Sequence, residues 1–200
     1  MEMTYYEPAT GMTLVPLALE RRGLPADNAV LALAGIYPLD HNIPAHDATY
    51  YRAEPSGGPH PKPDDPAVYV QEYAVVPIVL GEAKAAKLGE LTQAFERAQA
   101  TGHTLSVCGF EVDANETADR NVRGLITKLE ATGAPSTPFC DYTNTLRQAT
   151  LAQLKTIQLE IIGYGEALYA RKWALRESVN SAETVEDVVA VTVSFGEAGA

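Results

Sequence analysis

Proline and glycine constrain this fold more than any other feature, because they divide the first 66 residues into short pieces. Proline fixes φ and lacks an N–H donor, so it interrupts helices and central strands alike. Residues 1–45 are punctuated at eight positions: Pro8, Gly11, Pro16, Gly23, Pro25, Gly35, Pro38 and Pro44. Residues 55–66 hold five prolines in twelve positions. Long regular elements are therefore excluded here, and residues 55–66 are expected to form an exposed, extended loop with no strand interior.

Short elements are still predicted between these breaks. Residues 16–22 form one or two helical turns stopped by Gly23, and Asp27 caps a second short helix over residues 29–34. Residues 48–53 and 68–76 are rich in tyrosine and valine, which favour strands. The sequence predicts that these two segments pair as a hairpin across the proline loop.

Helical periodicity dominates after residue 80. Residues 81–100 predict an amphipathic helix closed by Gly102. Residues 104–112 alternate as a strand does, with Ser106, Cys108, Phe110 and Val112 on one side. Asp113, with Glu116 three residues later, is expected to begin a helix that ends at Gly133.

The longest helix is predicted over residues 151–178, capped by Thr150 and Gln153. Gly163 and Gly165 interrupt it at a cost of about 1 kcal/mol each, which predicts either a bend or a backbone packed closely against them. Trp173 is expected to pack beside the apolar stripe, so its replacement by alanine would cost about 3–5 kcal/mol. A last helix begins at Thr184, and residues 189–195 are expected to finish as a strand.

Together these elements predict an α+β protein in three segments. Residues 1–80 form a proline- and glycine-rich β region, residues 81–102 a connecting helix, and residues 103–200 an α-rich α+β domain with the long helix.

Charge and composition limit the partners. The net charge is −11, from 26 acidic and 15 basic residues, and such a surface repels phosphate backbones, which argues against nucleic acid as a partner. Because no apolar run approaches about 20 residues and the first residues lack a signal-peptide pattern, a membrane partner is not expected either. Cys108 and Cys140 have no metal-binding spacing, and a disulfide between them is left open.

No motif for catalysis or cofactor binding is found. The chain has no Gly-x-Ser-x-Gly elbow and no phosphate-binding loop. His41 and His46 lie near Asp40 and Asp47, but their spacing matches no zinc pattern, and solvated loop residues are favoured over a metal site. The sequence therefore predicts a protein that is not an enzyme, with no catalytic residues, no metal and no cofactor.

Tyrosine is the most suggestive residue type. The chain has ten tyrosines against four phenylalanines and one tryptophan, and tyrosine is favoured where one end of a ring is dry and the other wet, as at interfaces. Tyr50, Tyr51, Tyr69 and Tyr73 of the predicted hairpin are the candidates for partner binding. The alternative, that these rings only cover the sheet, is equally weighted.

Three stretches resemble small proteins encoded beside bacteriophage tail-fibre genes. Residues 110–126 resemble the family's F-x-x-D … R-x-x-G-A-I passage, and residues 141–144, 150–154, 168–176 and 179–188 follow in the order of a recurrent phage-tail domain of unassigned function, over residues 104–190. Phe139 stands where that family has tryptophan. Residues 31–47 with 69–78 resemble a second segment of these proteins. Residues 5–11 with 24–30 are similar to the start of tail-fibre assembly proteins.

The resemblance implies a role in tail-fibre assembly and leaves that role open. One hypothesis is an assembly chaperone that binds the phage tail-fibre protein in the host cytoplasm. The other is a structural component of the virion tail, in contact with baseplate or tail proteins. Homo-oligomerisation is open under both. A third hypothesis, a peptidoglycan hydrolase, requires a catalytic acid in a groove, and the sequence points to none.

Overall fold

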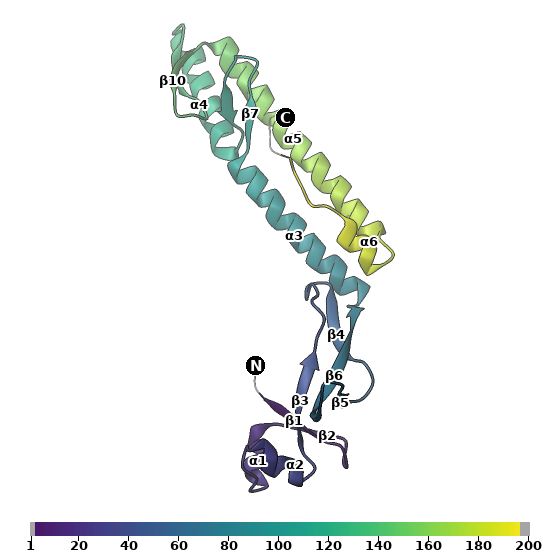
Figure 1. Cartoon of the computed structure of the whole chain (residues 1–200). Coiled ribbons are helices and arrows are strands. Elements are labelled where there is room, and N and C mark those ends of the chain that lie inside the picture. Colours follow the sequence, from purple (N-terminus) through teal and green to yellow (C-terminus); the bar gives the residue numbers. More distant parts are fainter. Residues whose placement is uncertain (1–2, 197–200) are drawn as a thin grey trace. The chain divides into compact units, whose positions relative to one another are not determined.

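The computed structural model describes residues 3–196, and the chain divides into two compact units, Met1–Ile78 and Val79–Ala200. The α+β class predicted from the sequence is confirmed, with most strands in the first unit and the long helix in the second (Figure 1). The boundary lies just before the helix that the sequence placed as a connection, and this helix is part of the second unit.

The first unit is a sheet with two short helices. Its strands are β1 (Thr4–Glu7), β2 (Met12–Leu14), β3 (Tyr37–Asn42), β4 (Tyr51–Pro55), β5 (His60–Lys62) and β6 (Asp65–Pro77), and its helices are α1 (Pro16–Arg21) and α2 (Asn28–Leu33). The order across the sheet is β2-β1-β3-β6-β4, and β5 also pairs with β6. Both helices form as predicted, and Asp27 Oδ1 accepts from the N–H groups of Ala29 and Val30 at the start of α2.

The helices cover one end of one face of this sheet. Tyr5 of β1 is buried in a small core together with Leu14, Leu19, Leu31 and Ile36. Because side chains alternate along a strand, Tyr6 lies on the opposite face, away from α1 and α2. The two faces of β1 are therefore differently covered.

Strand β6 is the organising element of the sheet. The predicted hairpin is present as the antiparallel pair β4–β6, and β6 also pairs in parallel with β3, which was not predicted. The proline loop was expected to contain no strand, and this was wrong: β5 pairs antiparallel with β6 from within it. An edge strand with irregular register tolerates prolines because it does not need every N–H for pairing.

The second unit is built on α3 (Leu80–Thr101), α4 (Glu116–Thr132) and α5 (Leu151–Ser181), with the short α6 (Val185–Ala190). Two hairpins join the helices, β7 (His103–Leu105) with β8 (Glu111–Asp113) and β9 (Thr137–Cys140) with β10 (Leu146–Ala149). Helices α3 and α5 run side by side along the unit, and α4 packs against the first half of α5 (Figure 1). Thr150 and Gln153 form the predicted capping box.

Three local predictions for this unit were wrong. Residues 104–112 form the β7–β8 hairpin rather than one strand, because Gly109 adopts a left-handed φ of 87° and Ser106 N–H donates to the carbonyl of Phe110. Asp113 ends β8, and Asn115 caps α4 instead. Residues 189–195 do not form the predicted strand: residues 189 and 190 end α6, and the segment that follows runs beside α5, where Arg171 donates to the Ser194 carbonyl and Phe195 packs on Phe95.

Gly163 and Gly165 do not interrupt α5, which continues through both. A β-carbon at either position would have no neighbour within 4 Å, so no described segment of the chain packs closely there. Of the two predicted alternatives, a bend or a closely packed backbone, the second is not provided by any described segment of this chain.

Candidate partner-binding surface

One face of the first unit carries a row of aromatic side chains. The registers of β1–β3 and β3–β6 place five residues on the same side of the sheet, and we define the aromatic face by them: Tyr6, Tyr37, His41, Tyr69 and Tyr73. All five are half-buried. They alternate with residues of the opposite face, as pleating requires. The face is thus assembled from three strands that are far apart in sequence.

The tyrosine rings contact one another across the strands. The ring of Tyr69 lies 5.2 Å from that of Tyr6 and 5.3 Å from that of Tyr37, centroid to centroid, in tilted arrangements. These separations are within the favourable range for aromatic pairs. Contact with neighbouring rings restricts the motion of Tyr69, so the surface it offers is pre-ordered.

His41 connects the three strands at this face. Thr4 Oγ1 lies 2.8 Å from His41 Nε2, and the Tyr73 hydroxyl lies 2.9 Å from His41 Nδ1. The sequence placed His41 in a solvated loop, and this was wrong: it lies in β3, and only His46 lies in the loop, bonded to the Pro44 carbonyl. In enzymes, a hydroxyl hydrogen-bonded to an imidazole can be a nucleophile next to its general base. Here, however, the group that orients the imidazole is a phenol in place of a carboxylate, and the contact ties β1, β3 and β6 together.

The four tyrosines predicted for partner binding have different positions. Tyr69 and Tyr73 lie in β6 on the aromatic face. Tyr51 begins β4 opposite Pro77, further along the sheet. Tyr50 is only 6% exposed, so it is a core residue. The structure therefore brings Tyr69 and Tyr73 together, leaves Tyr51 at a distance along the strand and encloses Tyr50.

Sequence reasoning missed Tyr6, Tyr37 and His41. The period-two pattern Tyr37, Leu39, His41 is typical of a strand and was available in the sequence. Pro38 and Pro44, on either side, favoured irregular structure instead, and nothing local indicates that this segment pairs with β6.

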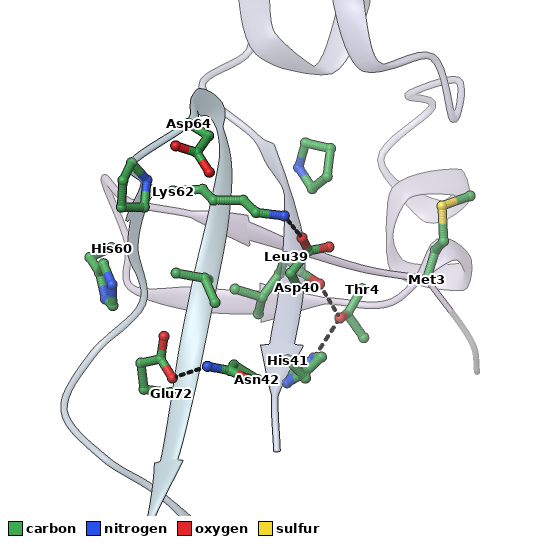
Figure 2. A pocket seen from close by; sticks show the side chains of 13 residues that line it. Met3, Thr4, Leu39, Asp40, His41, Asn42, His60, Lys62, Asp64 and Glu72 are labelled. Atoms are coloured by element: carbon green, nitrogen blue, oxygen red, sulfur yellow. Dashed lines mark hydrogen bonds and ion pairs between the residues drawn. The ribbon is translucent and has the colours of Figure 1, made fainter. Parts of the chain in front are cut away.

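A hollow of about 640 Å³ lies mainly on the side of the sheet opposite the aromatic face (Figure 2). Four of its polar side chains form two pairs, Lys62 Nζ with Asp40 at 2.9 Å and Asn42 Nδ2 with Glu72 at 2.6 Å. The bond from Lys62 to Asp40 raises the pKa of the lysine above its usual value. These pairs connect β5 to β3 and β3 to β6. Within residues 3–196 no group of three His, Cys, Asp or Glu side chains is arranged to bind a metal.

The second unit exposes the single tryptophan of the chain. Trp173 was predicted to pack beside the apolar stripe of α5, and this was wrong, since it is 62% exposed. Counting about 100° per residue places Trp173 about 140° around the helix from buried Leu168. Cys108 and Cys140, whose pairing was left open, are free thiols.

Residues 82–193, more than half of the chain, match the model of a protein family described as a domain of unknown function (DUF4376). The match spans nearly all of the second unit and none of the first. No curated protein and no solved structure matches the chain. None of the described helices is both long enough and apolar enough to cross a lipid bilayer.

Proposed function

The chain belongs to the family of this domain of unknown function, and we propose that it is a tail-fibre assembly protein of a bacteriophage, which binds the fibre protein while the fibre folds. The family itself has no assigned function. Support for the tail-fibre role comes from the sequence resemblance, whose main stretch, residues 104–190, lies within the matched residues 82–193.

The aromatic face of the first unit is the observation on which the binding role rests. Tyr69 and Tyr73 are half-buried on a sheet face that α1 and α2 do not cover, and their hydroxyl-bearing rings combine apolar area with hydrogen-bonding capacity. Such residues are enriched where protein interfaces are most energetically important. A surface of this kind needs neither metal nor cofactor to bind a folding chain.

Co-expression with the fibre protein of the same phage tests this role. We expect the fibre to become soluble and to co-purify with the wild-type chain. Tyr69→Ala combined with Tyr73→Ala should weaken co-purification at least tenfold, since losing two interface tyrosines costs about 2 kcal/mol or more. Tyr142→Ala is the matched control, because Tyr142 is an exposed tyrosine of the second unit that stacks on His103. Tyr50→Ala is unsuitable, since it would damage the core.

Two results would contradict the proposal. If the fibre protein neither gains solubility nor co-purifies, the tail-fibre role is wrong. If it co-purifies equally with the Tyr69→Ala/Tyr73→Ala variant, the fibre is bound elsewhere. The protein composition of purified phage particles then separates the two roles. An assembly chaperone should be absent from the particles. If this protein is present in them, it is a structural component of the tail and not a chaperone.

A further inference from the structure

Helix α5 has a second apolar stripe, which other described elements cover only in part: the Tyr169 ring meets the Phe95 ring of α3 edge-on at 5.1 Å, centroid to centroid. Its four apolar members are strongly exposed: Leu159 70%, Ile162 39%, Tyr169 50% and Trp173 62%. Together with Glu166 and Arg176 they recur at spacings of three and four residues, the pattern of a coiled-coil seam. We define these six residues as the outer seam. An exposed seam of this regularity fits the face of another helix.

The two glycines of α5 lie beside this seam. At about 100° per residue, Gly163 lies on one side of the outer seam and Gly165 on the other. Each costs about 1 kcal/mol of helix stability relative to alanine, and neither is needed for packing within the described chain. Positions without side chains beside a seam allow a second helix to approach closely.

The part of the outer seam from Glu166 to Arg176 is complementary to itself when it is reversed. Tyr169 and Trp173 lie two residues to either side of Arg171, and Glu166 and Arg176 lie five residues to either side. A two-fold axis that crosses the helix pair at right angles, at the level of Arg171, therefore places Glu166 of each helix opposite Arg176 of the other. The same axis places Tyr169 of each helix opposite Trp173 of the other. A parallel pair would instead oppose glutamate to glutamate and arginine to arginine, which is repulsive.

Glu166 and Arg176 are available for such pairing. Neither has an ion-pair partner among residues 3–196, and they are separated by about 15 Å along the helix, too far to pair with each other. Arg176 lies 5.7 Å from the Trp173 ring, which leaves its charge next to the centre of the seam. Arg171 points away, donating to the Ser194 carbonyl.

We propose that this chain forms a homodimer in which the α5 helices of two copies pair antiparallel through the outer seam, about a two-fold axis at Arg171. The paired segment, residues 162–180, is about 27 Å long and leaves out Leu159, whose counterpart, residue 183, lies beyond the end of α5. Two helices in contact over this length bury an area at the small end of specific interfaces, so the dimer should dissociate on dilution through the micromolar range. The proposal does not depend on the tail-fibre role.

Sedimentation equilibrium of the full chain between about 1 and 200 µM tests the dimer directly, with dissociation expected within this range. Trp173, as the only tryptophan, provides a second reading, because its emission should shift to shorter wavelength as the dimer forms and its ring leaves water. A monomer at all concentrations, or a trimer, would overturn the proposal.

Charge exchange tests the register. Glu166→Arg alone and Arg176→Glu alone each create like-charge contacts twice in the dimer, and each should weaken association by about tenfold or more. The double variant Glu166→Arg/Arg176→Glu should restore it, since the opposite charges again face each other. Glu20→Arg, an exposed position of α1 in the first unit with the same change of charge, is the matched control and should leave association unchanged.

A dimer whose association responds equally to Glu166→Arg and Glu20→Arg, or is not restored in the double variant, would use another surface and contradict the antiparallel seam. All three substituted side chains are exposed, so loss of folding is not expected, and far-ultraviolet circular dichroism verifies the helix content of each of the four variants.

Discussion

The ring of Tyr164 in α5 occupies the space in which a side chain at Gly102 would lie. A β-carbon at position 102 would be 2.5 Å from Cε1 of Tyr164 and 2.8 Å from the Ala98 carbonyl oxygen. The Tyr164 hydroxyl donates to the same carbonyl at 3.3 Å, and burial raises the pKa of this phenol above its usual value. Because Gly102 has no side chain, the Tyr164 ring can pack against the end of α3, and this contact connects α3 to the middle of α5.

Gly102→Ala should therefore destabilise the second unit by about 1–3 kcal/mol, because the ring must move and its hydrogen bond is strained or lost. Urea denaturation measures the change. The control is Gly89→Ala within α3, the helix that Gly102 ends, where a β-carbon meets nothing within 4 Å and alanine should stabilise by up to about 1 kcal/mol. Equal effects of the two substitutions would contradict the close packing of Tyr164.

Trp173→Ala should change the free energy of unfolding of the monomer by less than about 1 kcal/mol, because the side chain is largely in water. Leu168→Ala, five residues earlier on the buried face of α5, should cost about 2–5 kcal/mol. Both are measured by denaturant titration at protein concentrations low enough to exclude association. A large cost at Trp173 would mean that its ring is covered in the monomer.

Tyr73→Phe should cost about 0.5–1.5 kcal/mol, because it removes the hydroxyl that bonds His41 Nδ1 and leaves that nitrogen without its partner in β6. Tyr51→Phe is the matched control, since the Tyr51 hydroxyl has no hydrogen bond to the described residues. Thermal unfolding of the two variants should show a lower midpoint for Tyr73→Phe alone. Unchanged midpoints for both would remove His41 as a link between strands.

The ionised carboxylate of Asp141 should make part of the folding stability depend on pH in the acid range. Burial by itself would raise the pKa of this carboxyl, but hydrogen bonds from Thr145 N–H, Arg147 and Thr143 outweigh it and lower the pKa from 3.8 to about 2. A carboxyl with a lower pKa in the folded state stabilises that state above its unfolded pKa, and the contribution is lost as the pH falls from about 4 to 2.

Asp141→Asn should thus be less stable than the wild type at pH 7, and the difference should shrink as the pH falls through this range. Unfolding free energies at several pH values measure it, and Asp187, whose pKa is also lowered, titrates equally in both proteins. A difference that is constant from pH 7 to 2 would contradict the role of the charged form of Asp141.

Elements with local start and stop signals could be predicted from the sequence. The Thr150–Gln153 and Thr184–Asp187 capping boxes mark the starts of α5 and α6, and Gly133, with a left-handed φ of 64°, ends α4 as expected. These signals act within four residues, so no knowledge of the tertiary structure was needed.

Pairings between distant segments could not be predicted in the same way. The parallel contact of β3 with β6 joins residues about 30 positions apart, and no local pattern specifies it. The aromatic face depends on this contact, so the sequence pointed to Tyr69 and Tyr73 but not to Tyr6 or Tyr37. Trp173 was misplaced for a different reason: hydrophobic residues follow two stripes on α5, and only one of them is buried.

The shared strand β6 has a consequence for how this protein can change over evolution. Because β3, β4 and β5 all pair with it, a shift of one residue in its register would turn Tyr69 and Tyr73 to the other side of the sheet and expose Val70 in their place. An insertion or deletion within β6 would therefore disrupt the aromatic face, whereas substitutions at every second position of the strand change this face and keep the register. Under the proposed binding role, substitution on this face changes the choice of partner while the strand keeps its length.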